Sequence, residues 1–233
     1  MSEGRQSART LKRQVLQIIG SDNWEEDGLN KLIQLPPMQV TNALIASFCD
    51  TDETIRWRVI TATGIVVSRL ADDDMESARN ILRRLMWSLN SESGGIGWGA
   101  PEAIAEIMAC HKTLADEFAR ILVSYAIPDG DNFLDLPELQ RGVLWGLGRL
   151  SQVRPELVQD IVAAIPFFIA SEDATVRGLS AWVAGILTRK DLHGYIEKLL
   201  DDDREISLYL DRVLQQIQVK ELAREALERI EAG

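Results

Sequence analysis

The sequence of 233 residues lacks any apolar run that approaches the roughly 18 uninterrupted residues of a membrane-spanning helix. Its first ten residues are polar, so no secretory signal segment is predicted before Leu11. Cysteine is scarce as well, because only Cys49 and Cys110 are present and both lie among apolar residues at positions expected within helices. We therefore expect no membrane association and two buried, reduced thiols in a cytoplasmic protein.

Basic charge is also in deficit. The chain has 25 Lys and Arg against 36 Asp and Glu, which gives a formal net charge of −11. A nucleic-acid surface needs clustered Lys and Arg to contact phosphates, so a nucleic-acid partner is disfavoured. The two histidines, His111 and His193, have no histidine or cysteine four positions away, and the adjacent pair Cys110-His111 points in different directions on a helix. No metal site, catalytic residue or cofactor is predicted.

One acidic loop has the spacing of a calcium site without its remaining ligands. Asp129, Asp131 and Asp135 have the spacing of ligand positions in an EF-hand loop. The positions where that loop needs Asp or Asn, Gly and Glu hold Phe133, Leu134 and Gln140 instead. We therefore predict an acidic loop that binds no calcium.

What the sequence does contain is a repeat. The segments Asp52-Glu-Thr-Ile-Arg56 and Asp173-Ala-Thr-Val-Arg177 each lead into a run of small and apolar residues with the same layout. An apolar residue followed nine positions later by a small one marks most further copies. The six aligned pairs are Leu11 and Gly20, Ile55 and Gly64, Ile96 and Ala105, Leu139 and Gly148, Val176 and Gly185, and Ile206 and Gln215.

This register resembles the inner helix of HEAT repeats, in particular the short HEAT-like repeats named after phycobilisome lyases. The resemblance implies an all-α, right-handed superhelix of five to six helix pairs, a HEAT- or armadillo-like solenoid that forms a single domain over residues 1–233. It also implies that Arg56 and Arg177 pair with the turn residues Asp52 and Asp173 of the same or the adjacent repeat. Inner helices are expected near residues 11–20, 55–70, 100–110, 138–152, 175–189 and 204–217, with a polar capping helix at 220–231 and no strand.

The third repeat is interrupted. Residues 90–99 hold four glycines at positions 94, 95, 97 and 99, where an inner helix would otherwise begin. Glycine in such a segment indicates positive φ angles or close backbone approach. We predict a loop over residues 91–99 and a helix that starts at Ala100 or Pro101. The loop lacks the lysine and the preceding strand of a phosphate-binding P-loop.

A helical wheel of the repeat places positions 3, 7 and 11 opposite the core positions. In HEAT-like stacks this side of the inner helices lines the concave groove, and Trp and Arg are residue types that contribute strongly to binding interfaces. The alternative is that each tryptophan packs over the next repeat, as we expect for Trp24 and Trp87. The candidate groove residues are Trp57, Trp98, Glu102, Glu106, Arg141, Trp145, Arg149 and Trp182, and we expect partly exposed rings for Trp57, Trp145 and Trp182.

Two acids on this side of the third repeat lie one helical turn apart. Glu102 and Glu106 therefore face the same way and could hold a cation or act as a general base with a raised pKa. The alternative is structural: Glu102 offsets the helix dipole and Glu106 pairs with Arg141 or Arg149.

These observations favour a non-catalytic scaffold that binds a protein or a peptide in a Trp-lined groove. One alternative is a HEAT-like DNA glycosylase or another nucleic-acid-binding protein, which the net charge of −11 disfavours. A second alternative, a chromophore lyase or chaperone of the phycobilisome type, follows from the resemblance alone.

Overall fold

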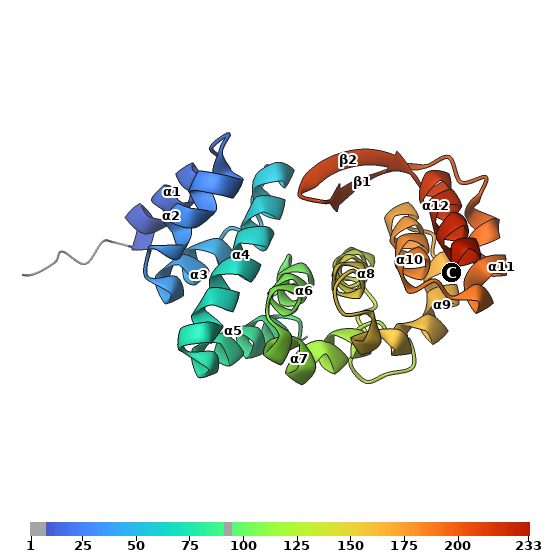
Figure 1. The fold of residues 1–233 in the computed structure, drawn as a ribbon, viewed down its shortest axis with the longest axis horizontal. Coiled ribbons are helices and arrows are strands. Elements are labelled where there is room, and N and C mark those ends of the chain that lie inside the picture. The colour runs from blue at the N-terminus through green and yellow to red at the C-terminus, as the bar shows by residue number, and fades with distance from the viewer. Residues whose placement is uncertain (1–7, 91–94) are drawn as a thin grey trace, which may run out of the picture. The chain divides into compact units, whose positions relative to one another are not determined.

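The computed structural model describes residues 8–90 and 95–233, and almost all of its regular structure is helical (Figure 1). The chain folds as an all-α solenoid in which antiparallel helices succeed one another, as the repeat register predicts. Its contacts divide it into two compact units, residues 1–111 and 112–233. Within the described residues, no helix combines the length and the apolar character that crossing a bilayer requires.

The first unit is built around one long helix. This helix, α4 (Glu53–Asp73), contacts α3, α5 and α6 and buries Val59, Val66 and Val67 between them. Asp52 caps its start by accepting hydrogen bonds from the backbone N–H groups of Thr54 and Ile55. The other elements of the unit are α1 (Ala8–Ile19), a π-helical turn (Trp24–Gly28), α2 (Leu29–Ile33), α3 (Pro37–Ile45), α5 (Met75–Ser88) and α6 (Ala100–Cys110).

The start of the third inner helix agrees with the sequence. Helix α6 begins at Ala100, and Gly97 and Gly99 before it adopt φ angles of 71° and 73°. A Cβ atom at Gly97 would lie 2.7 Å from the carbonyl oxygen of Ser88, and one at Gly99 would lie 2.9 Å from Cβ of Phe48. Both glycines therefore provide the left-handed backbone and the close approach that bring the chain into α6. The part of the predicted loop at 91–94 lies outside the described residues.

The second unit contains helices and one hairpin. The regular inner helices are α8 (Pro137–Ser151) and α10 (Ala174–Leu187), and α7 (Lys112–Ser124) precedes them. Between α8 and α10 the chain forms 3-10 turns at Pro155–Leu157 and Gln159–Ala164 and the short α9 (Ile165–Ile169). The remaining elements are the turns Lys190–Leu192 and Glu197–Leu199, α11 (His193–Ile196), β1 (Glu205–Leu210), β2 (Val213–Gln218) and α12 (Val219–Ala232).

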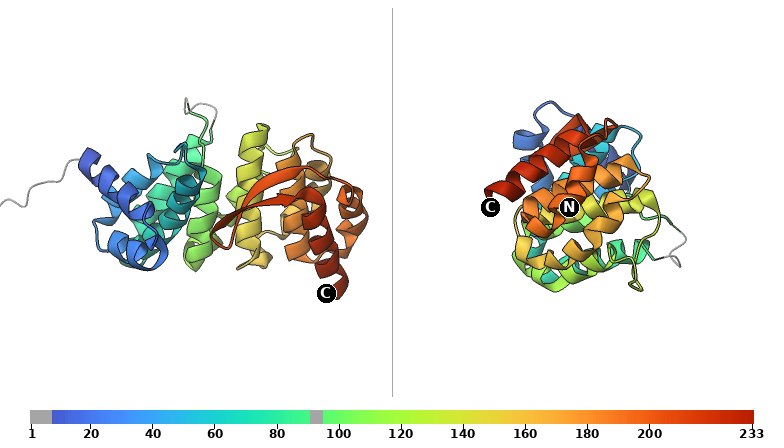
Figure 2. Two further views of the ribbon diagram at one scale, coloured as in Figure 1. Left: turned by 90° about the horizontal axis from the view of Figure 1, so that it is seen from above. Right: turned by 90° about the vertical axis from the view of Figure 1, so that its right-hand side faces the viewer.

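The sixth inner helix, expected at 204–217, does not exist. Strands β1 and β2 pair there as an antiparallel hairpin closed by Asp211 and Arg212, which both have positive φ angles. Such a turn matches the right-handed twist of the strands. Figures 1 and 2 show the hairpin over α10 with α12 beside it. The expectation of no strand is therefore wrong over residues 205–218.

The sequence of this segment explains why a hairpin forms. Ile206 and Leu208 lie two positions apart, on one face of β1, and both are buried, while Tyr209 on the other face is buried as well. The position that needs a small residue, where one inner helix meets the next, holds the long side chain of Gln215. A helix here would place that side chain against its neighbour, whereas in the hairpin Gln215 is exposed.

The last helix, α12, takes the place that the sixth inner helix would have filled. A reciprocal pair of hydrogen bonds between Gln218 and Glu221 caps its start. The sequence predicts a polar capping helix here. One side of α12 is nevertheless apolar, is buried and packs on α10. The buried residues are Val219, Leu222, Ala223, Ala226 and Ile230.

Small residues set the spacing between successive helices. In α10, a Cβ atom at Gly185 would lie 2.7 Å from Cα of Ala226 in α12. In α8, a Cβ atom at Gly148 would overlap the indole ring of Trp182 in α10. Both glycines stand at the same position of the repeat register. At this position α8 contacts α10, and α10 contacts α12.

We expect Gly148→Ala to lower the free energy of unfolding by at least about 1 kcal/mol, because the added methyl overlaps the rigid Trp182 ring and overpacking of a core costs about 1–3 kcal/mol. The matched control is Gly194→Ala in α11, where no atom lies within 4 Å of the added Cβ. This change should be neutral or stabilising by up to about 1 kcal/mol, since alanine favours helices over glycine. Urea denaturation measures both, and equal stability of the two variants would contradict the packing described.

Candidate binding surface

The four candidate groove tryptophans divide between the two units. In the first unit, Trp57 on α4 is half-buried and Trp98, just before α6, is 40% exposed. In the second unit, Trp145 on α8 and Trp182 on α10 are 4% and 5% exposed. Trp145 and Trp182 therefore lack the partly exposed rings that were predicted, while Trp57 is half-buried as a residue and its indole Nε1 is buried.

The hairpin and the packing of adjacent helices bury the two tryptophans of the second unit. The indole Nε1 of Trp145 donates a hydrogen bond of 2.7 Å to the backbone carbonyl oxygen of Tyr209 in β1, and the two rings lie 6.4 Å apart. The ring of Trp182 covers Gly148. A Cβ atom at Gly178, another position expected in the groove, would lie 2.6 Å from the side chain of Ile206 in β1. Strand β1 therefore covers the side of α8 and α10 on which the groove was predicted.

The two tryptophans expected to pack differ from each other. Trp24 is buried, and the guanidinium of Arg58 lies 5.2 Å from its ring centroid. Trp87 on α5 is 57% exposed, so the expectation that it packs between repeats is wrong. It stands near the end of an amphipathic helix, where helical periodicity alone does not separate the core face from its margin.

The arginines and aspartates of the second unit link neighbouring repeats. Arg141 on α8 donates from Nε to the Asp173 carboxylate at 3.0 Å, while Asp173 also caps α10 by accepting from the N–H of Val176. Arg177 on α10 donates from Nε to Asp202 at 2.8 Å, in the turn that precedes β1. Each arginine thus pairs with the turn aspartate that follows in the chain, and Arg177 does not pair with Asp173.

Hydrogen bonding controls the ionisation of these aspartates. Burial alone would raise the pKa of Asp173, but hydrogen bonds from Arg141 and from backbone N–H groups outweigh burial and lower it. The pKa of Asp202 is lowered in the same way, against burial, by Arg177 and Arg204. Arg141 therefore serves a structural link, although its side chain remains partly exposed.

In the first unit the corresponding residues are arranged differently. Arg56 pairs with Glu53 at 2.9 Å, while Asp52 caps α4. Their predicted mutual pairing is therefore replaced by two local interactions. In the second unit, the candidate groove residue Arg149 is half-buried on α8.

Glu106 and Glu102 of α6 have different surroundings. Glu106 is buried, and its side chain lies over Gly64 of α4, where an added Cβ would come within 2.5 Å of Cγ. Glu102 is half-buried, and its Oε2 atom is buried and accepts no hydrogen bond within the described part of the chain. Burial raises the pKa of Glu102 to about 7, and a backbone hydrogen bond and the positive charge of Arg56 offset only part of that effect.

The cysteines and histidines form no candidate catalytic or metal centre. Cys49 and Cys110 form no disulfide and are exposed, which corrects the expectation that they are buried. Cys110 is the last residue of α6 and Cys49 lies in the turn after α3, so neither stands on the core face of a helix. Among the residues that the structure describes, no group of three or more His, Cys, Asp or Glu side chains is arranged to hold a metal ion.

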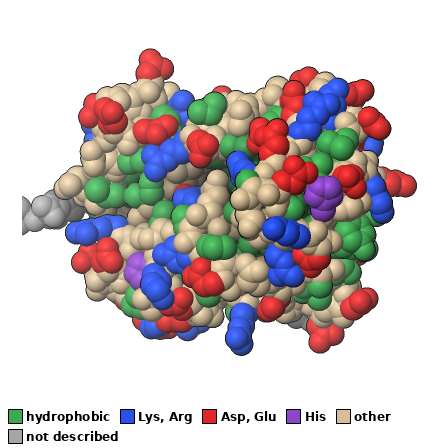
Figure 3. Space-filling view, turned by 45° about the vertical axis from the view of Figure 1, so that its right-hand side comes forward, with side chains coloured by type: hydrophobic (Ala, Val, Ile, Leu, Met, Phe, Trp, Pro, Cys, Tyr) green, Lys and Arg blue, Asp and Glu red, His purple; other side chains and the backbone are tan. Residues whose placement is uncertain are grey.

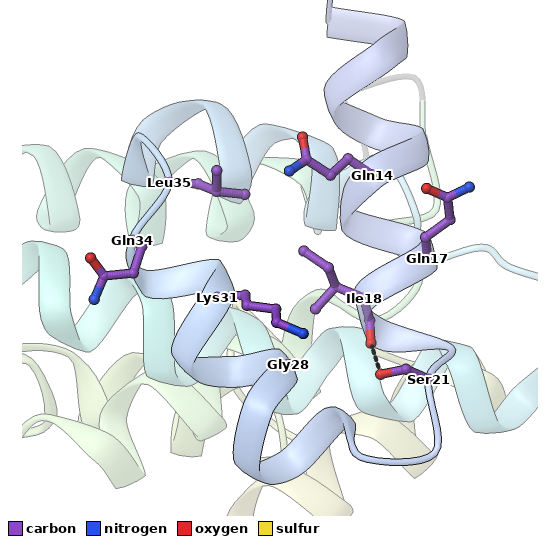
Figure 4. Close-up of a pocket in the computed structure, with 8 residues that line it drawn as sticks. All are labelled: Gln14, Gln17, Ile18, Ser21, Gly28, Lys31, Gln34 and Leu35. Atoms are coloured by element: carbon purple, nitrogen blue, oxygen red, sulfur yellow. Dashed lines mark hydrogen bonds between the residues drawn. The ribbon is translucent and has the colours of Figure 1, made fainter.

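Sequence reasoning missed two hollows. In the first unit, a hollow of about 450 Å³ lies between α1 and α2, and side chains such as Gln14, Gln17 and Lys31 line it (Figure 4). In the second unit, a hollow of about 870 Å³ lies beside the Arg177–Asp202 pair. Neither contains a predicted groove residue. The glutamines that line the hollow of the first unit give no sequence signal. In the hollow of the second unit, the acidic run at residues 201–203 is the part of the lining that stands out in the sequence.

Charge on the surface follows the composition. Acidic and basic side chains are interspersed on the face drawn in Figure 3. This face therefore carries no continuous basic field of the kind that contacts a phosphate backbone.

Comparison with known proteins finds a relative that is similar to about half of this sequence. No family model matches the sequence. An uncharacterized protein from Archaeoglobus fulgidus is 32% identical over 111 residues, which is 47% of this chain and 53% of that protein. The chain therefore spans about half the length of this relative.

Solved structures with a similar fold are engineered repeat proteins. An engineered protein solved by the Northeast Structural Genomics Consortium has a TM-score of 0.53 with 14% identity and full coverage of both chains. A designed armadillo repeat protein in complex with the peptide (KR)4 has a TM-score of 0.50 with 15% identity, over 93% of this chain and 98% of the other. Likeness at this level of identity supports the helical repeat solenoid and nothing further.

We expect Trp145→Phe to destabilise the protein by about 0.5–1.5 kcal/mol, because it removes the buried hydrogen bond from the indole Nε1 to the Tyr209 carbonyl oxygen. The matched control is Trp87→Phe at an exposed position, which should change the stability by less than about 0.5 kcal/mol. Thermal and urea denaturation test this. If Trp145→Phe were as stable as Trp87→Phe, the hydrogen bond would not hold the hairpin in place.

We also expect stability to decrease as the pH rises. The pKa of Glu102 lies near 7 in the folded chain and near its ordinary value of 4.5 in the unfolded chain. The folded state therefore binds the proton more tightly, and the resulting stability is present below pH 4.5 and is lost as the pH rises to about 7. The full loss is about 3 kcal/mol. Glu102→Gln should remove this loss, while Glu228→Gln at an exposed position of α12 should leave the pH profile of urea denaturation unchanged.

Proposed function

We propose that the protein is a non-catalytic scaffold that binds a basic segment of a partner protein at the surface of the first unit formed by α4 and α6. The observation that carries this proposal is the Oε2 atom of Glu102, which is buried and accepts no hydrogen bond among the described residues. An ionised carboxylate in such a position requires a donor, and a lysine or arginine side chain supplies one with the opposite charge.

The pKa of Glu102 gives this site a defined response to a cation. At a pKa of about 7 the carboxyl group is close to half protonated at neutral pH. A bound ammonium or guanidinium group stabilises the ionised form, so it lowers this pKa and releases a proton. Binding of a basic ligand should therefore be coupled to ionisation of Glu102.

Two tryptophans of the same unit support a cationic ligand. Trp57 is half-buried on α4, which packs against α6, and Trp98 is exposed just before α6. Lysine and arginine side chains bind favourably over indole rings. The proposed site therefore comprises Trp57, Trp98 and Glu102 with Glu106 beside them, whereas Trp145, Trp182 and Arg141 have structural contacts in the second unit.

The net charge and the comparison with a solved structure also support a basic partner. The chain has a net charge of −11, which favours association with positively charged segments. The designed armadillo repeat protein with a similar fold is in complex with a peptide of alternating lysine and arginine. Membership of the phycobilisome-lyase type of HEAT-like repeats and a cytoplasmic location are part of this proposal, and both rest on the sequence.

The direct test uses a fluorescein-labelled octapeptide of four Lys-Arg pairs, measured by fluorescence anisotropy between pH 6 and pH 8. We expect binding to strengthen up to about pH 7 and then to level off, because below that pH the peptide must displace a proton from Glu102. Glu102→Gln should weaken binding at pH 8 by about tenfold or more, since hydrogen bonds to charged groups contribute about 1.5–3 kcal/mol. It should also remove the pH dependence.

The matched control is Glu228→Gln, which removes the same charge from an exposed position of α12. It should leave binding of the basic peptide unchanged. A probe in which uncharged residues replace the lysines and arginines should bind neither protein. The proposal fails if Glu102→Gln and the unmodified protein bind the basic peptide alike, because binding would then reflect the net charge alone.

A further inference from the structure

A cluster of three phenylalanines stands at the surface of the second unit. Phe133 comes from the loop between α7 and α8, and Phe167 and Phe168 come from α9. The ring of Phe133 lies 5.7 Å from that of Phe167 and 6.4 Å from that of Phe168, and the latter two rings are 5.2 Å apart in an edge-on arrangement. These three rings therefore form one contiguous apolar group.

Only part of this cluster belongs to the core. Phe168 is 1% exposed and Phe133 is half-buried against it, so these two seal the interior. Phe167 is 50% exposed, and Leu136, three residues after Phe133, is 37% exposed. The contacting rings of Phe133 and Phe167 thus leave apolar surface in contact with solvent, and Leu136 adds exposed apolar surface on the same loop as Phe133. We call Phe133, Leu136 and Phe167 the phenylalanine patch.

The loop that presents Phe133 is held in place by hydrogen bonds. The backbone N–H of Leu134 donates to the carbonyl oxygen of Tyr125 at 3.1 Å, and the side-chain amide of Gln140 donates to the carbonyl oxygen of Leu134 at 3.1 Å. The amide of Asn132 donates to the Ser124 hydroxyl at 3.0 Å. A partner would therefore meet a preformed surface and incur little cost for ordering it.

Acidic side chains without ion pairs surround the patch in the sequence. Asp131 and Asp135 lie two residues before and after Phe133, and Asp129 lies two residues further away. All three are exposed, and in the described part of the chain none forms an ion pair. Residues 128–138 contain no lysine or arginine at all. The loop that carries Phe133 is therefore acidic and has no basic residue of its own.

We propose that the phenylalanine patch docks a basic, amphipathic segment of another protein. An apolar side chain of the partner segment packs on Phe167. The lysine or arginine residues of the segment that flank this side chain lie next to Asp131 and Asp135. A second copy of this chain fits poorly, because two identical patches would bring aspartates against aspartates. An anionic lipid surface is repelled by the same charges.

This proposal is independent of the surface at Glu102, because it uses different residues in a different unit. The probe is a fluorescein-labelled 14-residue amphipathic peptide of leucine and lysine, and its counterpart replaces lysine by glutamate. We expect the leucine–lysine peptide to bind and the leucine–glutamate peptide not to bind. Phe167→Ala should weaken binding at least tenfold, and the double variant Asp131→Asn, Asp135→Asn should weaken it several-fold and reduce its dependence on salt.

Two matched controls separate the patch from general charge and hydrophobicity. Tyr195→Ala removes another exposed aromatic ring of the same unit, and the double change Glu225→Gln, Glu228→Gln removes two exposed acidic charges from α12. Both should bind like the unmodified protein. Thermal melts confirm that Phe167→Ala is folded, with Phe167→Ser as a second variant.

Three results would overturn the proposal. The first is equal binding by Phe167→Ala and the unmodified protein, which would mean that the peptide responds only to the net charge. The second is equal binding of the glutamate peptide. The third is concentration-dependent dimerisation in sedimentation velocity that Phe167→Ala abolishes, which would make a second copy the occupant of the patch.

Discussion

The close approach of α8 to α10 and of α10 to α12, each at one glycine, is the constraint on which the rest of the second unit depends. Gly148 accommodates the ring of Trp182, and Gly185 accommodates the backbone of Ala226. Any larger residue at these positions separates the two helices, because protein cores do not absorb extra volume without strain. The large indole ring and the missing side chain are therefore two halves of one contact, which explains why a tryptophan that a helical wheel places away from the core is buried.

The same constraint accounts for the hairpin. Where the register meets Gln215 instead of a small residue, a further inner helix cannot approach its neighbour, and the chain forms β1 and β2 instead. Strand β1 then lies over α8 and α10 and offers the carbonyl oxygen of Tyr209 to Trp145. Helix α12 completes the stack by packing on α10 through Ala226. A single departure from the repeat thus changes the secondary structure and also which surface of the unit is open.

Most of the fold was accessible from the sequence, and the failures have identifiable causes. The repeat register predicted the solenoid and the start of α6 at Ala100, because small residues and glycines at fixed spacing report directly on backbone geometry. The register failed at residues 205–218, where it predicted a helix. The spacing of Ile206 and Leu208 also fits a strand, and a strand forms there. The register also misplaced Arg177, since sequence cannot decide which of several aspartates a long side chain reaches.

The candidate site could be predicted only where no other part of the same unit covers the helix face. A wheel identifies the side of a helix that its own repeat does not bury, and for Trp57 that side remains partly open within the first unit. For Trp145 and Trp182 the covering elements come from elsewhere in the chain, and no property of the repeat itself reveals them. In the second unit the chain thus occupies the predicted groove side with its own hairpin. Apolar surface left over from folding stands instead on the short α9 and the loop before α8, at Phe167 and Leu136, where the departures from regular helix pairs occur.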